Sequence, residues 1–245
     1  MFVVAHISDL HFNGSRINRG RAESTLSYLN ARAAGINALL VTGDIADSGT
    51  AAQYAEAAQI LRTDIPMLLT GGNHDVRENL RAALLDAGQD EPVNSSRVVD
   101  DVLFVVADSS IPGSSAGYLT DETVAWMADE ISAVGPEMPV FVAFHHPPAD
   151  VQMPYMDTIR QTGEQRVAAF VERFPNIVGF FCGHVHSGCV TNFAGRPLIT
   201  APGVVSTLNL PFEGRDILNR GQPPGIAFHI LDDRRLVTHF RSVMF

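Results

Sequence analysis

The sequence contains no lysine and only two cysteines, Cys182 and Cys189, among 245 residues. Two cysteines are too few for the disulfide framework of a small secreted protein, so we expect two reduced thiols and a cytoplasmic protein. The sequence also has no apolar run long enough to cross a bilayer, and no basic and apolar leader before its first polar motif. These absences disfavour a disulfide-rich secreted protein and an integral membrane protein.

Positive charge is scarce as well. The chain has 17 basic residues (Lys plus Arg) and 27 acidic ones, which gives a formal net charge of −10. An acidic protein repels the phosphate backbone, so extended nucleic acid is not the expected partner. Bound metal cations can still attract one small anionic ester. With 46% hydrophobic residues the chain can build a sizeable core, and we expect a single domain over residues 1–245.

Short apolar runs alternate with helical patterns along most of the chain. Buried strands are predicted over residues 2–8, 38–42, 66–70, 97–99, 102–107, 140–144 and 177–182. Helices are predicted over 21–34, 51–62, 77–87, 120–135 and 165–173, with caps at Thr50 and Thr120 and a stop at Gly88. The last third holds short strands over 190–193, 198–200, 226–231 and 236–240, and an irregular loop over 206–225. This pattern indicates the α/β class.

Five of the predicted strands end in a cluster of Asp, Asn or His. The residues with metal-binding side chains in these clusters are Asp9, His11, Asp44, Asn73, His145, His184 and His186. Open α/β sheets bind ligands at the carboxyl ends of their strands, so the clusters can meet in one crevice. In the pairs Asp9/His11 and His184/His186, residues i and i+2 of an extended segment point to the same side. Each pair can therefore reach one metal ion.

The donor set predicts both the kind of metal and the chemistry. Imidazole and carboxylate donors without thiolate suit Mn, Fe, Co, Zn or Ni better than Ca or Mg. Two such ions, about 3.5–4 Å apart, can clamp an in-line displacement, with one activating hydroxide and the other stabilising charge on a phosphate. His74 follows Asn73 and is better placed to face the substrate. As an imidazolium it can protonate the leaving oxygen.

Taken together, the motifs resemble the signature of the calcineurin-like metallophosphoesterases. The matching motifs are Asp9-x-His11, Gly43-Asp44-x-x-Asp47, Gly72-Asn73-His74-Asp75, His145-x-Pro147 and Gly183-His184-x-His186. The resemblance implies a four-layer αββα sandwich with two mixed β-sheets and a dimetal site at the strand ends.

The resemblance also implies a role for each residue. One metal would be held by Asp9, His11, Asp44 and His186, and the other by Asp44, Asn73, His145 and His184. Asp44 would bridge the two ions. His74 would be the catalytic histidine and Asp47 the carboxylate that orients it, while His146 would be a neighbour of the site. Apart from His74, no substrate-binding residue can be carried over.

One departure separates branches of the family. Ser/Thr protein phosphatases carry Asp-Arg-Gly where this chain has Asp47-Ser48-Gly49, so a bidentate clamp for a dianionic monoester is missing. Residues 117–123, 145–148 and 171–175 look like the bacterial class III cyclic nucleotide phosphodiesterases and glycerophosphodiesterases. This likeness implies hydrolysis of small phosphodiesters by a metal-activated hydroxide, with 3′,5′-cyclic nucleotides (cAMP or cGMP) favoured.

The same likeness implies two divalent ions per chain, Fe or Mn before Zn or Co, and a homodimer or higher homo-oligomer. Three alternatives stay open: a glycerophosphodiesterase, a broad phosphomonoesterase of the same fold, and a non-catalytic metal-binding scaffold. A scaffold is expected to lose ligands, whereas every ligand position is filled here. The loop over 206–225 either covers the site or is a plain surface loop.

Overall fold

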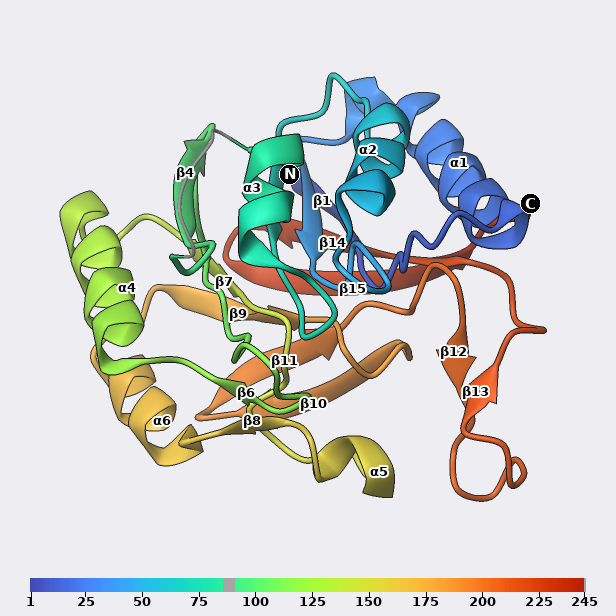
Figure 1. Cartoon of the computed structure of the whole chain (residues 1–245). Coiled ribbons are helices and arrows are strands. Elements are labelled where there is room, and N and C mark those ends of the chain that lie inside the picture. Colours follow the sequence, from blue (N-terminus) through green and yellow to red (C-terminus); the bar gives the residue numbers. More distant parts are fainter. Residues whose placement is uncertain (86–90, 245) are drawn as a thin grey trace.

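The computed structural model describes residues 1–85 and 91–244, and its centre is a pair of stacked mixed sheets (Figure 1). The first sheet has the strand order β15 (Arg235–Ser242), β14 (Gly225–Asp232), β1 (Phe2–Ile7), β2 (Ala38–Thr42) and β3 (Met67–Thr70). The second has the order β10 (Cys189–Phe193), β11 (Arg196–Thr200), β9 (Ile177–Cys182), β7 (Val140–Ala143), β5 (Val102–Val106) and β4 (Ser95–Val99).

Both sheets combine parallel and antiparallel strands. Strands β1, β2 and β3 run parallel, while β14 and β15 run antiparallel to their neighbours. In the second sheet β5, β7, β9 and β11 are parallel, and β4 and β10 close its edges in the antiparallel sense. The carboxyl ends of the parallel strands in each sheet therefore lie at one edge.

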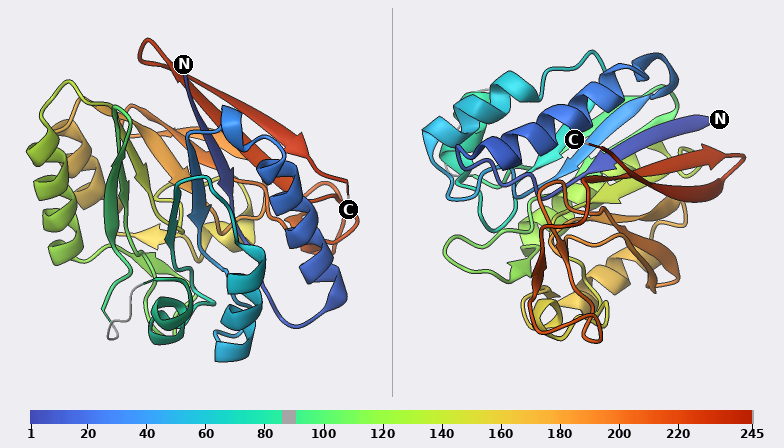
Figure 2. Two further views of the ribbon diagram at one scale, coloured as in Figure 1. Left: turned by 90° about the horizontal axis from the view of Figure 1, so that it is seen from above. Right: turned by 90° about the vertical axis from the view of Figure 1, so that its right-hand side faces the viewer.

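Helices cover the two outer faces (Figure 2). The first sheet is covered by α1 (Arg16–Asn30), α2 (Ala51–Ile60) and α3 (Arg77–Leu84), and the second by α4 (Asp121–Val134) and α6 (Glu164–Glu172). Buried side chains form three main clusters, one between each pair of adjacent layers. Side chains that alternate along β2 explain this division between clusters. Leu39 and Val41 face the helices, while Ala38 and Leu40 face the other sheet. The predicted four-layer αββα sandwich is confirmed. The single domain stays a prediction.

Several predicted boundaries shift. Helix α1 begins at Arg16, five positions before the prediction, because Ser15 caps it by accepting a hydrogen bond from the Asn18 amide at 3.2 Å. It ends at Asn30, and a 3₁₀ turn over Ala33–Gly35 follows. Helix α3 ends at Leu84, and the predicted stop at Gly88 lies outside the described residues. The predicted caps at Thr50 and Thr120 are present.

Short elements were missed from the sequence. They are α5 (Pro154–Asp157), the parallel pair β6 (Gly117–Tyr118) and β8 (Gln161–Thr162), and the antiparallel pair β12 (Thr207–Leu208) and β13 (Leu218–Asn219). The last pair turns the predicted irregular loop over 206–225 into a hairpin at its base. Among the described residues, no helix is both long and apolar enough to span a membrane.

Candidate metal centre

The polar residues that follow the strands of both sheets come together at one edge of the sandwich. Strands of the first sheet are followed by Asp9, His11, Asp44, Asn73 and His74, and strands of the second by His145, His184 and His186. A direct contact joins the two groups, because the amide of His184 donates to Oδ1 of Asp9 at 3.2 Å. The crevice expected from the strand pattern is therefore built from both sheets.

One cluster consists of Asp9, His11, Asp44 and His186, with one ligand atom from each within 4.8 Å of all the others. Nε2 of His186 lies 3.4 Å from Oδ1 of Asp9 and 3.3 Å from Nε2 of His11. All four side chains are buried or nearly so. The cluster has the same four members that the family resemblance assigns to one metal.

A second cluster lies on the other side of Asp44. It contains His145, His146 and His184, again with ligand atoms within 4.8 Å of one another. Oδ2 of Asp44 lies 3.4 Å from Nε2 of His145 and 3.6 Å from Nε2 of His11. One carboxylate oxygen thus lies near an imidazole of each cluster, as a bridging ligand must.

His146 has a larger place in the site than the sequence indicated. Its Nδ1 lies 2.8 Å from the hydroxyl of Ser109, and its Nε2 is buried without a hydrogen-bond partner. Its ring centroid is 4.5 Å from that of His184. His146 is therefore a member of the second cluster, although the His-His-Pro-Pro motif alone gave no basis for placing it there.

The backbone at the predicted ligands is strained. Asp9, His11, Asp44, His184 and His186 all have positive φ, between 40° and 71°. Non-glycine residues rarely adopt this region, and it is found where the surrounding structure enforces it at functional sites. The expectation that Asp9/His11 and His184/His186 are extended pairs was wrong. Left-handed turns, not β pleat, direct these side chains, and the second pair divides between the two clusters.

Gly72 allows the closest approach in the site. A Cβ atom at this position would lie 2.2 Å from Oδ1 of Asp44 and 2.8 Å from Nε2 of His145. Both neighbours are packed polar side chains, so no larger residue fits. The amide of His74, two residues later, donates to Oδ1 of Asp44 at 2.9 Å. The loop after β3 therefore wraps around the bridging carboxylate.

Hydrogen bonds to main-chain carbonyls fix the histidine rings. Nδ1 of His145 donates to the Thr42 carbonyl at 2.6 Å, and Nε2 of His184 donates to the Ile159 carbonyl at 3.1 Å. Nδ1 of His186 lies 3.2 Å from the Ser206 carbonyl. A carbonyl can only accept, so the opposite ring nitrogen in each case is left for a metal.

Buried polar atoms without hydrogen-bond partners mark the same place. Among the described residues they include Oδ2 of Asp9, Oδ1 of Asn73 and Nε2 of both His145 and His146. Leaving such atoms unpaired is costly in a protein interior, and their convergence fits metal coordination. By this criterion the residues fit two divalent cations.

Charge coupling at the site is strong. Burial alone would raise the pKa of Asp44, but the charges of His145 and His11 hold it well below its usual range. Burial would likewise lower the pKa of His145, but Asp44 raises it to about 9. Burial and the neighbouring His145 lower the pKa of His184 to about 3. The metal-free protein thus keeps His184 neutral, the form that binds a metal.

His74 and Asp47 do not pair as the resemblance implied. Nδ1 of His74 donates to the main-chain carbonyl of Asp47 at 2.7 Å. The Asp47 carboxylate instead lies 3.3 Å from Nδ1 of His11, and this contact lowers the pKa of Asp47. Asp47 therefore fixes the His74 ring through its backbone and the His11 ring through its side chain.

A cavity of about 300 Å³ opens beside these residues. Asp44, Asn73, His74, His184 and His186 line it. The hairpin of the 206–225 segment lines it as well, through Leu208, Ile217 and Leu218. This segment is thus part of the wall around the site. None of the described residues lining the cavity is Arg or Lys.

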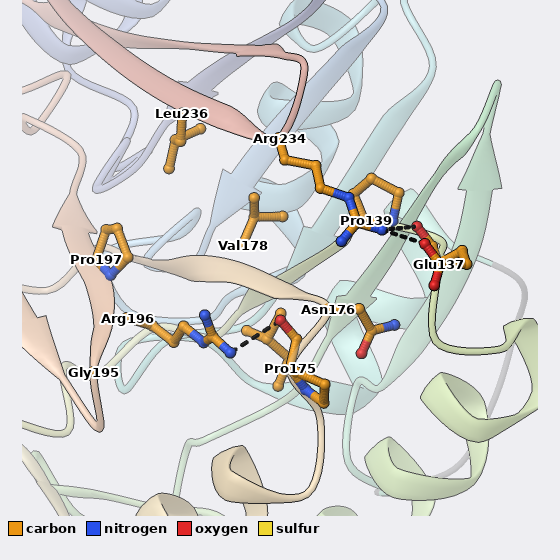
Figure 3. Close-up of a pocket in the computed structure, with 11 residues that line it drawn as sticks. Glu137, Pro139, Pro175, Asn176, Val178, Gly195, Arg196, Pro197, Arg234 and Leu236 are labelled. Atoms are coloured by element: carbon orange, nitrogen blue, oxygen red, sulfur yellow. Dashed lines mark hydrogen bonds and ion pairs between the residues drawn. The ribbon is translucent and has the colours of Figure 1, made fainter.

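Another hollow, of about 410 Å³, lies at the opposite ends of β7, β9 and β11 (Figure 3). Its two arginines are engaged with the protein, Arg234 with Glu137 and Arg196 with the Pro175 carbonyl. Among the described residues that line it there is no histidine, and the one carboxylate is that of Glu137. This hollow therefore lacks the cluster of histidine and carboxylate side chains that a two-metal centre needs.

Comparisons with known proteins agree with the fold and the motifs. The family profile described as calcineurin-like phosphoesterase matches residues 2–188. The glycerophosphodiester phosphodiesterase GpdQ of Enterobacter lignolyticus is 35% identical over 244 residues, covering 93% of this chain and 86% of that protein. A cAMP/cGMP dual specificity phosphodiesterase of Mycobacterium tuberculosis is 28% identical, and the match covers 85% of this chain and 69% of that protein. The crystal structure of a dimetal phosphatase from Danio rerio superposes with a TM-score of 0.75 at 14% identity, covering 98% of this chain and 96% of that one.

Proposed function

Because the chain belongs to the calcineurin-like phosphoesterase family, we propose that it is a binuclear metal-dependent phosphodiesterase acting on small phosphodiesters, with 3′,5′-cyclic nucleotides favoured. The observation that carries the proposal is the position of Asp44 between the two histidine clusters, within 3.6 Å of His11 and 3.4 Å of His145. A shared carboxylate flanked by imidazoles suits a pair of cations and leaves the cavity side open to a substrate.

The proposed ligands follow from the two clusters. Asp9, His11, Asp44 and His186 would hold one cation, and Asp44, Asn73, His145 and His184 the other, with His146 beside the second. Two divalent cations there would supply positive charge to the phosphate oxygens and lower the pKa of a coordinated water. The strained loops hold the ligand side chains in place before any cation binds.

His74 would act on the leaving group. Its Nδ1 proton is committed to the Asp47 carbonyl, so Nε2 is the ring nitrogen able to transfer a proton. His74 is exposed and lines the cavity. In hydrolysis the water oxygen forms a bond to phosphorus and gives one proton to the solvent, the P–O ester bond breaks, and the leaving alkoxide takes a proton from Nε2 of His74, which the solvent then replaces.

The cavity supports a diester in preference to a monoester. A monoester dianion carries one more negative charge than a diester, and enzymes commonly meet that charge with a bidentate Arg. Ser48 stands where the protein phosphatases have that Arg, and none of the described residues lining the cavity is Arg or Lys. A monoanionic diester needs no such clamp.

A glycerophosphodiesterase is the second candidate, favoured by the 35% identity to a GpdQ relative. Both candidates share the same centre and differ in the organic arms of the ester. Kinetic assays with cyclic AMP and with glycerophosphoethanolamine distinguish them, and we expect the larger kcat/KM for cyclic AMP.

The test of the diesterase proposal compares two aryl esters. The protein is freed of metal with a chelator, reloaded with Mn²⁺, Fe²⁺, Co²⁺ or Zn²⁺, and assayed with bis(p-nitrophenyl) phosphate and p-nitrophenyl phosphate. We expect the diester to have the larger kcat/KM. A strong preference for the monoester would replace this proposal with a phosphomonoesterase. Absence of both bound metal and activity with every ion would leave a non-catalytic scaffold.

We further propose Fe or Mn as the physiological metals, as the family resemblance implies; the clusters found among the described residues offer imidazole and carboxylate donors and no thiolate, which such ions accept. Elemental analysis of protein purified without added metal tests this. A cytoplasmic location is supported by two free cysteines, of which Cys182 is buried. Cell fractionation tests the location.

A homodimer or higher homo-oligomer is also proposed. The edge strand β15 is eight residues long, and its Val237 and Phe240 side chains are both 38% exposed. Long open edges with apolar side chains are commonly covered by another chain. Light scattering coupled to gel filtration gives the mass that decides between monomer and oligomer.

A further inference from the structure

The side of the cavity that faces the candidate metal centre is apolar. It is made by two short segments that stand outside the sandwich, α5 with the turn after it and the β12–β13 hairpin (Figure 1). The side chains concerned are Tyr155, Met156, Ile159, Leu208, Ile217 and Leu218. We call this surface the apolar wall. It lines the same cavity as His74 and four of the predicted metal ligands, so the organic part of an ester bound at the centre would meet it.

The apolar wall continues away from the centre. A neighbouring cavity of about 230 Å³ shares Tyr155, Met156, Leu208 and Ile217 with the first and is also lined by Pro211 and by the polar residues Asn209, Arg215 and Asp216. Tyr155 is 56% exposed, Ile217 50% and Leu218 45%. Several large apolar side chains exposed side by side, next to a polar centre, mark a ligand surface more often than a plain exterior.

The hairpin is anchored to the centre. Nδ1 of His186 lies 3.0 Å from the Ser206 hydroxyl, and the hydroxyl of Ser187 donates to the Leu208 carbonyl at 3.3 Å. The amide of Asn209 donates to the Ile217 carbonyl at 2.9 Å, which extends the β12–β13 pairing. The distance from the predicted ligand His186 to the wall is therefore fixed by the fold.

We propose that the apolar wall binds the nucleobase of a cyclic nucleotide and so selects cyclic nucleotides over glycerophosphodiesters. This inference rests on the proposed diesterase function. A purine or pyrimidine is flat and uncharged, and it gains from stacking against aromatic and apolar side chains whatever its hydrogen-bonding edge. The glycerol and ethanolamine arms of a glycerophosphodiester are polar or cationic. Against the wall they would lose hydrogen bonds to water without replacing them.

The first experiment measures selectivity. Tyr155→Ala and Ile217→Ala remove parts of the wall at half-exposed positions, where truncation leaves the fold intact. Both are compared with Phe212→Ala. The Phe212 side chain belongs to the same hairpin, is 83% exposed and lines neither cavity. With Mn²⁺-loaded proteins, we expect the ratio of kcat/KM for cyclic AMP to that for glycerophosphoethanolamine to fall about tenfold in the wall variants, mainly through KM. Phe212→Ala should leave the ratio unchanged.

The second experiment measures binding without turnover. Calorimetric titration with adenosine 5′-phosphate, the expected product, should show about tenfold weaker binding to Tyr155→Ala than to the wild type. Binding of glycerol 3-phosphate should change less than twofold. Equal weakening of both ligands, or no weakening of either, would overturn the role of the wall.

The outcomes separate the two levels of the proposal. If the wild type cleaves diesters and the wall variants keep its substrate ratio, the wall inference fails while the diesterase function stands. If the wild type cleaves only monoesters, the proposed function fails first and the inference falls with it. A wild type that prefers glycerophosphoethanolamine, with that preference reduced in Tyr155→Ala, would assign the wall to the other substrate class and overturn the inference.

Discussion

The hydroxyl of Tyr54 donates a 2.8 Å hydrogen bond to Oδ1 of Asp75, and this contact links α2 to the loop that carries Asn73 and His74. The Asp75 carboxylate also accepts from the amides of Ile45, Ala46 and Gly72 at 2.9–3.1 Å. Tyr54 in turn accepts from the Val76 amide at 2.9 Å. The two loops that wrap around Asp44 are thus held together by one carboxylate and one phenol.

Tyr54→Phe should therefore lower the free energy of unfolding by about 1–3 kcal/mol, because it removes a buried donor and leaves Asp75 and the Val76 amide short of a partner. Urea unfolding of the metal-free protein measures the change. Tyr28→Phe is the control, since the Tyr28 hydroxyl makes no hydrogen bond among the described residues. Equal stability of Tyr54→Phe and wild type would contradict the assigned role.

Asp44→Asn tests the bridging ligand. An amide cannot place negative charge between two cations, so metal content should fall from two ions per chain to at most one. Diester turnover should fall by more than about a hundredfold, since the metals supply several kcal/mol of charge stabilisation. Elemental analysis and steady-state kinetics measure both quantities. Asp64→Asn, at an exposed loop carboxylate, should change neither. Two bound ions in Asp44→Asn would refute the bridge.

His74→Ala should slow the hydrolysis of cyclic AMP by about a hundredfold or more, because an alkoxide leaving group needs a proton. The loss should be much smaller for bis(p-nitrophenyl) phosphate, whose leaving phenolate is stable without one. The comparison needs only kcat for both substrates in the variant and the wild type. A loss of less than about threefold for cyclic AMP would remove His74 from its proposed role.

Acid should destabilise the fold through a buried histidine pair away from the centre. Nδ1 of His6 lies 3.0 Å from Nε2 of His229, and each ring also meets a threonine hydroxyl. Burial lowers the pKa of His229 to about 3, and burial together with His229 lowers the pKa of His6 well below its usual value. Both rings therefore stay neutral in the folded protein at pH values where the unfolded chain protonates them.

The folded state then binds fewer protons than the unfolded state below about pH 6.5. The stabilisation is complete above that pH and is lost as pH falls toward 3, by up to about 1.4 kcal/mol per pH unit for each histidine. Urea unfolding at pH 7 and pH 5 should show a smaller loss for His229→Gln than for the wild type. His239→Gln, at an exposed position on β15, is the control and should behave as the wild type does. Identical pH dependence in all three proteins would count against this account.

Much of the fold could be predicted because its central parallel strands are short buried runs, and most of them lead within a few residues into a polar cluster. Ala38–Thr42, for example, is buried along its whole length, and Asp44 follows it. Helix starts were harder, because apolar spacing reports only the packed part of a helix. The first turn of α1 is mostly polar and its Ile17 is exposed, so it was missed, although Ser15 caps it.

The candidate site likewise has one part that the sequence predicts and one part that it does not. Its residues could be predicted from motifs, but the orientation of each side chain depends on contacts between distant segments. The Asp47 carboxylate meets His11, and the His74 ring meets a backbone carbonyl, which no local pattern encodes. The second of two adjacent histidines, His146, belongs to the cluster because β7 and β9 bring it beside His184. The apolar wall rests on elements of two to four residues, too short for any periodicity to predict.

The most direct test of a metal-dependent phosphodiesterase follows cyclic AMP by ³¹P NMR in ¹⁸O-enriched water. With two equivalents of Mn²⁺ or Fe²⁺ per chain, we predict that the diester signal is replaced by that of adenosine monophosphate carrying one solvent oxygen. The monophosphate should then persist, and a chelator should stop its formation. Conversion of added adenosine monophosphate to inorganic phosphate faster than cyclic AMP is consumed, or an unchanged signal with cyclic AMP and every other small diester, would contradict the account.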